Sequence, residues 1–206
     1  MAMTSQTPRK APQDRARFYT IDGMEYPSVT TILDVLDKPA LMWWAANMER
    51  QACETALLDV LGQDAAKDPL WVLEEMGKRL QGAKAFLREK DKAAAIGTAA
   101  HAWIEWRTRQ MLGEKVADEP EIPEAAQWAV EAWKDWAKAV EFTPLYVERV
   151  VYCRACVGCG FAGTFDWIAR VRDVVTLGDI KTSKAIYPEA FLQNVAYRHA
   201  ASEQGL

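Results

Sequence analysis

Two aspartates and a lysine near the carboxyl end of the chain have residue types and a spacing that suit chemistry. Asp166 and the triplet Asp179-Ile180-Lys181 lie in a run rich in Val, Ile, Phe, Trp and Thr, with a polar break at Arg172-Asp173. Such a run predicts two β-strands joined by a turn at the break. A turn centred there pairs residues whose numbers sum to 345, which places Asp166 opposite Asp179. Directly opposed side chains have Cβ atoms about 5 Å apart.

Facing carboxylates need a nearby positive charge, because two negative groups at this distance repel each other. Lys181 follows Asp179 by two residues, so its side chain projects from the same strand face. Two carboxylates with a lysine beside them suit a divalent cation and a water molecule that has to be activated. The alternative is an exposed charged hairpin. Because Asp is depleted in strands, the pattern favours the site.

Further polar residues before and after this hairpin extend the candidate site. His101, one of two histidines, ends the segment Gly97-Thr98-Ala99-Ala100-His101, and Glu105 follows one helical turn later on the same face. Glu148 lies on a predicted strand before the hairpin. Gln193 and Tyr197 are four residues apart on a predicted helix. Each has an ordinary interpretation when taken alone, as a hydrogen-bonded histidine or a surface pair.

The order of these motifs resembles the RecB-like branch of the PD-(D/E)XK nuclease superfamily. The motifs are Gly-Thr-x-x-His, a strand Glu, Gly-x-x-Asp, Asp-x-Lys-Thr and Gln-x-x-x-Tyr. The opening Tyr-Pro-Ser-Val-Thr-Thr-Ile-Leu, residues 26–33, is similar to phage-encoded exonucleases of that branch, and the resemblance covers about residues 26–200. It implies a deoxyribonuclease of exonuclease type in phage or bacterial DNA recombination or repair. DNA would be its substrate and a single-strand annealing protein a partner.

The resemblance also implies how the metal would be held. Asp166 and Asp179 would bind it, with the Ile180 carbonyl and His101 as further ligands. Lys181 would orient or deprotonate the attacking water and stabilise charge in the transition state. Carboxylate oxygens suit Mg²⁺, and an imidazole ligand makes Mn²⁺ a second candidate.

The remaining motif residues would support this centre. Glu148 would hydrogen-bond a metal-bound water or place a second metal. Gln193 and Tyr197, and with them Thr182, would contact DNA phosphate or brace the site. Glu105 would be structural.

The four cysteines leave two interpretations open. Cys153, Cys156 and Cys159 have a metal-like spacing and, with Cys53, would suit Zn²⁺ or an iron–sulfur cluster. In relatives with such a cluster, however, three cysteines follow the Gln-x-x-x-Tyr helix, whereas here they precede Asp166. The N-terminus lacks the apolar core of a signal peptide, which predicts a cytoplasmic protein. The resemblance implies that this is the cytoplasm of a bacterium or of a phage-infected host. Reduced thiols in a loop are the other interpretation.

Charge and hydropathy narrow the functional classes. The net charge of −4 excludes a uniformly basic nucleic-acid coat. Residues 78–109 nevertheless carry a net +5 and residues 114–141 a net −5. The basic stretch is either a local phosphate-binding face or an ordinary solvated helix surface. No apolar stretch is long enough to predict a membrane span.

The elements that would position these residues follow from local signals. Asp22-Gly23 predicts a hairpin over 18–26, and Ser28 predicts a helix cap. Most of the nine Trp residues are at helical spacing, which favours core packing over base stacking. The expected helices cover 28–36, 40–61, 69–80, 83–112 with an interruption at Gly97-Thr98, 123–140 and 188–203, and the expected strands lie at 145–152 and within 161–181.

This order of elements predicts an α+β fold. We expect a disordered leader over 1–17 and a single domain over 18–206, mainly helical in 18–140, with the sheet and the motif helix in 141–206. The implied superfamily core is a helix, a three-stranded mainly antiparallel sheet and a helix, followed by a final strand that is missing before the chain ends at Leu206. A truncated, inactive DNA-binding or regulatory relative is therefore the alternative function.

Overall fold

The computed structural model describes residues 17–36, 39–63, 68–80, 84–154 and 160–206. Of the leader expected over 1–17, only Arg17 is among them. Contacts divide the chain into two compact units, one of Met1–Leu36 with Gly97–Leu206 and one of Asp37–Ile96. A single domain was expected over 18–206, without this division.

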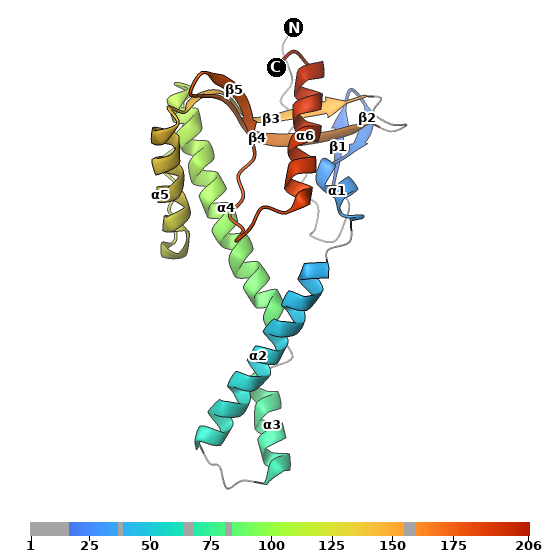
Figure 1. Ribbon diagram of the computed structural model, residues 1–206, viewed down its shortest axis with the longest axis vertical. Coiled ribbons are helices and arrows are strands. Elements are labelled where there is room, and N and C mark those ends of the chain that lie inside the picture. The colour runs from blue at the N-terminus through green and yellow to red at the C-terminus, as the bar shows by residue number, and fades with distance from the viewer. Residues whose placement is uncertain (1–16, 37–38, 64–67, 81–83, 155–159) are drawn as a thin grey trace. The chain divides into compact units, whose positions relative to one another are not determined.

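An antiparallel sheet of three strands forms the centre of the first unit (Figure 1). Its strands are β3 (Thr143–Cys153), β4 (Phe161–Val171) and β5 (Val174–Gly178), in that order across the sheet. Trp167 pairs with Gly178, and Ile168 pairs with Leu177, so the predicted register is confirmed. The turn between β4 and β5 contains no glycine. Arg172 instead adopts the left-handed conformation (φ 55°) that a tight hairpin turn requires.

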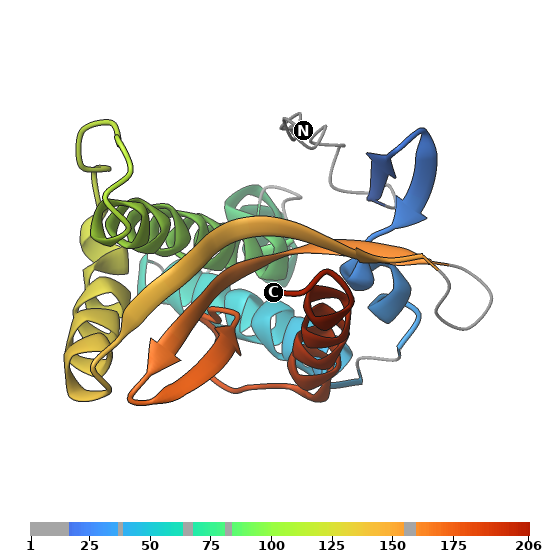
Figure 2. The same cartoon turned by 90° about the horizontal axis from the view of Figure 1, so that it is seen from above.

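Helix α6 (Pro188–Glu203) lies across one face of the sheet, with the same bounds as predicted (Figure 2). Its Tyr197 packs with Phe165 and Val151 in the main core cluster. Gly163 on β4 allows this approach, because a Cβ atom there would overlap the Tyr197 ring. The Tyr197 ring of α6 therefore packs directly against the main chain of β4 at Gly163.

The opposite face of the sheet carries a small hairpin, β1 (Phe18–Ile21) and β2 (Met24–Pro27). Tyr19 and Tyr26 of this hairpin pack on Ala162, whereas the neighbouring Phe161 packs with the α6 core, as the alternation of side chains along a strand requires. The predicted Asp22-Gly23 turn is confirmed, with φ angles of 51° and 78°.

The helix that follows this hairpin, α1 (Val29–Leu33), is capped as predicted by Ser28. The Ser28 hydroxyl oxygen accepts a hydrogen bond from the Thr31 main-chain N–H at 3.0 Å. This bond satisfies one of the N–H groups that a helix start leaves without a partner.

Helices α4 (Ala85–Met111) and α5 (Glu124–Ala139) build an aromatic core with β4. Trp103, Trp133, Phe142 and Trp167 form a chain of ring contacts with centroids 5.1–6.0 Å apart. Core packing is thus confirmed for Trp103 and Trp167. It is wrong for Trp128, whose relative exposure is 57%.

Helix α4 continues without a break through Gly97-Thr98, so the predicted interruption is wrong. A single glycine costs a helix only about 1 kcal/mol relative to alanine. Here it also serves packing, because a Cβ atom on Gly97 would lie 3.0 Å from the Thr182 hydroxyl oxygen.

The second unit consists of α2 (Pro39–Gln63), α3 (Pro69–Leu80) and the first part of α4. Proline opens α2 and α3, as expected for the first helical turn. The buried residues of the second unit include Ala56, Val60 and Val72. Trp43 is 74% exposed, so the prediction that it packs in the core is wrong. None of the helices in the described ranges combines the length and the apolar composition that a membrane span requires.

Candidate metal-binding site

The candidate residues of the first unit meet where β5 ends. Asp166 lies in β4, Asp179 directly follows β5, His101 comes from α4 and Glu148 from β3. A small hollow between these elements is lined by His101, Ile104, Glu105, Thr108, Val147, Glu148, Asp166, Trp167 and Ile180.

Asp166 links α4 to the segment after β5. Its Oδ2 atom accepts a hydrogen bond from the Ile180 main-chain N–H, which fixes the segment that carries Asp179 and Lys181. On the other side, His101 Nδ1 lies 3.5 Å from Asp166 Oδ1. The hydrogen bond to Asp166 raises the pKa of His101, with the negative charges of Asp166 and Asp179 acting in the same direction. The imidazole and the carboxylate therefore face each other, as expected of residues that would share a ligand.

A hydrogen-bonded network surrounds Asp179. The Lys181 ammonium forms an ion pair with Asp179 Oδ2 and donates to Gln193 Oε1 at 3.1 Å. Gln193 Nε2 lies within hydrogen-bond distance of Asp179 Oδ1 (3.2 Å) and of the Tyr197 hydroxyl (2.9 Å). Gln193 is 8% exposed and Tyr197 4% exposed. Their buried positions favour the bracing role over direct contact with DNA phosphate.

The donor set suits a hard divalent cation. Burial raises the pKa of Asp179, and the charge of Asp166 raises it further, whereas Lys181 lowers it. Asp179 Oδ2 is buried, and its partner is the Lys181 ammonium group. A cation near both aspartates would relieve the repulsion between their charges. Asp166, Asp179 and His101 have the ligand types that the resemblance implies, and Ile180 lines the same hollow. Among the described residues, however, the ligand atoms of these three side chains do not form one group within 4.8 Å.

Glu148 occupies a strained position beside Asp166. It adopts a left-handed conformation (φ 45°) inside β3, which is uncommon for a residue other than glycine. The flanking pairs Val147–Trp167 and Arg149–Phe165 keep one register, so Glu148 stays level with Asp166. Strain of this kind is concentrated at functional sites.

The surroundings of Glu148 favour its neutral form. Burial raises its pKa to about 7, and the charges of Asp166 and Glu105 act in the same direction. Glu105 is held by Arg109, whose Nε donates to its Oε1 at 2.9 Å. Glu105 was expected to be structural, but its charge also raises the pKa of Glu148. Its position one helical turn after His101, on the same helix face, is the sequence feature that indicates its closeness to the site.

The remaining predicted residues are Thr182 and the four cysteines. Thr182 packs against Gly97 at the edge of the site. Cys53 is an exposed free cysteine of the second unit, and Cys156 and Cys159 are outside the described residues. Cys153 is in a disulfide, which differs from the expected reduced thiol.

Comparison with known proteins gave no match for this chain, whether among protein-family models, curated proteins or solved structures.

Proposed function

We propose that this chain is a metal-dependent nuclease that hydrolyses phosphodiester bonds in DNA, built on a RecB-like PD-(D/E)XK core. The observation that carries the proposal is the grouping of Asp166, Asp179 and Lys181 at the end of one hairpin, with Lys181 paired to Asp179. The order α4, three antiparallel strands and α6 supports it, because it agrees with the core that the motifs imply.

Asp166, Asp179, His101 and the Ile180 carbonyl would hold Mg²⁺ or Mn²⁺. When bound, such an ion lowers the pKa of water and neutralises charge on the phosphate and on the leaving oxygen. Glu148 is level with Asp166 and lines the same hollow, beside the proposed metal ligands. The raised pKa of Glu148 lets it donate as well as accept near neutral pH.

Lys181 supplies a positive charge that can stabilise the negative charge of the phosphodiester in the transition state. Its ammonium group is held from two sides, by Asp179 and by Gln193 Oε1, so its position is fixed before substrate arrives. Donors that are already in place for developing charge need no reorganisation during the reaction. Gln193 in turn is held by Tyr197, which extends this support into the core.

The proposal extends to an exonuclease that acts in phage or bacterial recombination or repair beside a single-strand annealing protein. This part is supported by the resemblance of residues 26–33 to phage exonucleases.

Cleavage of end-labelled linear DNA and of closed circular DNA, each with Mn²⁺ or Mg²⁺, tests the proposal. The wild type is compared with Asp179→Asn and with Asp173→Asn, an exposed aspartate in the turn of the same hairpin. We expect loss of linear DNA by the wild type and Asp173→Asn, and no loss by Asp179→Asn. Cutting of the circle would identify an endonuclease instead. A folded protein that binds DNA and cuts neither substrate would contradict the proposed activity.

A further inference from the structure

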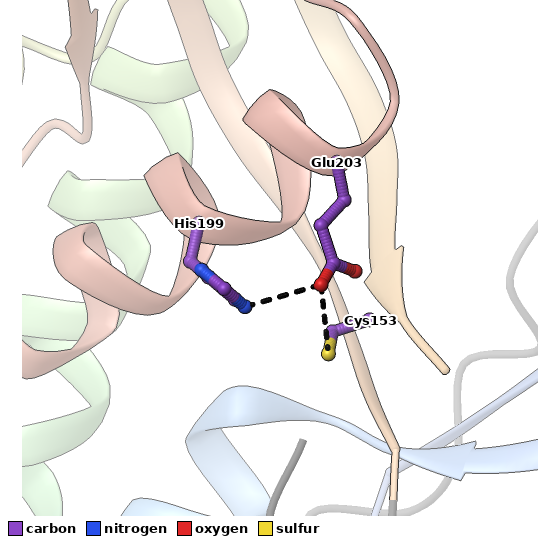
Figure 3. Close-up of side chains that lie close together, drawn as sticks. All are labelled: Cys153, His199 and Glu203. Carbon is purple, nitrogen blue, oxygen red and sulfur yellow. Dashed lines mark hydrogen bonds and ion pairs between the residues drawn. The ribbon is translucent and has the colours of Figure 1, made fainter. Parts of the chain in front are cut away.

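A second group of metal-ligating atoms lies where the last turns of α6 meet the end of β3 (Figure 3). Cys153 Sγ, a carboxylate oxygen of Glu203 and an imidazole nitrogen of His199 all lie within 4.8 Å of one another. His199 Nε2 is 3.3 Å from Glu203 Oε1, and Cys153 Sγ is 3.8 Å from the same oxygen. None of these residues lines the hollow at Asp166, so the group is separate from the site of the proposed nuclease.

These separations suit tetrahedral Zn²⁺. Bonds of about 2.0–2.3 Å to nitrogen, oxygen and sulfur place tetrahedral ligand atoms roughly 3.3–3.8 Å apart. Two of the contacts already have this length, and the third is at most 4.8 Å. The side chains of His199 and Glu203 are 54% and 46% exposed, so small rotations can close the remaining distance.

The backbone supports a cation at this place. His199 and Glu203 are one turn apart on α6 and therefore project from the same helix face. Glu203 is the last residue of α6, where the helix dipole favours positive charge. Cys153 is anchored in the core beneath α6 at 1% exposure, which fixes the third ligand.

The oxidation state of Cys153 decides whether the group can bind metal. Its sulfur is in a disulfide, and the metal ligand is the thiolate. A dithiol or phosphine reductant supplies two electrons, and two protons complete the pair of thiols. Cys153 then loses its proton when it binds a cation.

We propose that the reduced chain binds Zn²⁺ through Cys153, His199 and Glu203, with water or another donor in the fourth position. The ion fastens the C-terminal end of α6 to β3. Because α6 also carries Gln193 and Tyr197, this fastening stabilises the helix that braces Lys181.

Titration of the reduced, metal-stripped full chain with Co²⁺ tests this site. Thiolate ligation gives Co²⁺ a charge-transfer absorption in the near ultraviolet, which the sulfur-free site at Asp166 cannot produce. We expect the band in the reduced wild type, its loss on addition of Zn²⁺, and no band in the oxidised chain. Absence of the band from the reduced wild type would overturn the proposal.

Variants then identify the ligands. His199→Gln and Glu203→Gln should each weaken Co²⁺ binding by about tenfold or more. Cys153→Ser should abolish the band, but it also changes a core residue, so the exposed His199 gives the deciding variant. The double variant Cys156→Ser, Cys159→Ser is the control and should retain the band. An unchanged band in His199→Gln, or its loss in the control, would show that other cysteines bind the ion.

Discussion

Glu148 combines two features that oppose its own stability. A left-handed backbone costs a residue other than glycine about 1–3 kcal/mol, and Glu148 has a φ of 45° within a strand. Burial and the neighbouring carboxylates raise its pKa from 4.5 to about 7, so its ionised form is unfavourable in the folded protein. A residue that combines both costs is better explained by a role at the site than by structural support.

The metal-free protein should reveal this cost through pH. For an acid whose pKa is raised by folding, the contribution to stability is greatest below the unfolded pKa, declines between about pH 4.5 and pH 7, and is constant above. Glu148→Gln should therefore stabilise the chain in EDTA near neutral pH by about 1–2 kcal/mol, since partial exposure screens the full effect. The difference should vanish near pH 4 in chemical denaturation.

A matched control exists at Glu141, which is exposed and has a similar φ of 53°. Glu141→Gln should not stabilise the chain as Glu148→Gln does, because the Glu141 side chain is exposed. Equal effects of the two substitutions would show that burial beside Asp166 and Glu105 is not the cause of the stabilisation.

At the scale of the elements, close approaches between α4, β4 and α6 position the site. Gly97 admits Thr182 against α4, and Gly163 admits the Tyr197 ring against β4. The segment from Asp179 to Thr182 is thus held by α4 on one side and by Gln193 of α6 on the other.

Gly97→Ala tests the first of these approaches. Replacing glycine by alanine inside a helix should stabilise it by about 0.5–1 kcal/mol, and Gly77→Ala in α3, which has no atom within 4 Å of the new Cβ, should show this gain. In Gly97→Ala most of the gain should be lost, because the new Cβ lies 3.0 Å from Thr182 Oγ1. Adding Thr182→Ala should restore it. Equal gains at Gly77 and Gly97 in thermal unfolding would exclude the contact.

At the scale of the whole molecule, local signals predicted much of the first unit. The Asp22-Gly23 turn, the Ser28 cap and the bounds of α6 depend on neighbouring residues, and the hairpin register follows from the polar break at Arg172-Asp173. The α+β class followed from their order.

Interactions between distant residues could not be predicted in this way. Gly97 lies close to Thr182, which is far away in the sequence. The raised pKa of Glu148 results from burial and from the charges of Asp166 and Glu105, which lie in other elements. The division into two units likewise depends on contacts rather than on a linker sequence, because α4 passes through the boundary at Gly97.

The division into two units predicts which part of the chain a bound cation stabilises. An ion present at 100 times its dissociation constant stabilises the state that binds it by about 2.7 kcal/mol. We expect Mn²⁺ to slow hydrogen exchange in β4, β5 and α6 and to leave α2 unchanged, because the candidate ligands belong to the first unit. Asp179→Asn should remove the protection. Similar protection of α2 would place the binding site elsewhere.

Replacement of Lys181 tests the central claim most directly. Lys181→Met removes the ammonium group between Asp179 and Gln193, whereas Lys184→Met removes an exposed lysine three residues later in the same segment. With Mn²⁺ and end-labelled linear DNA, we expect Lys181→Met to cleave about 100-fold more slowly than the wild type or worse, and Lys184→Met to remain close to it. Wild-type cleavage by Lys181→Met, in a protein that folds normally, would contradict the proposed site.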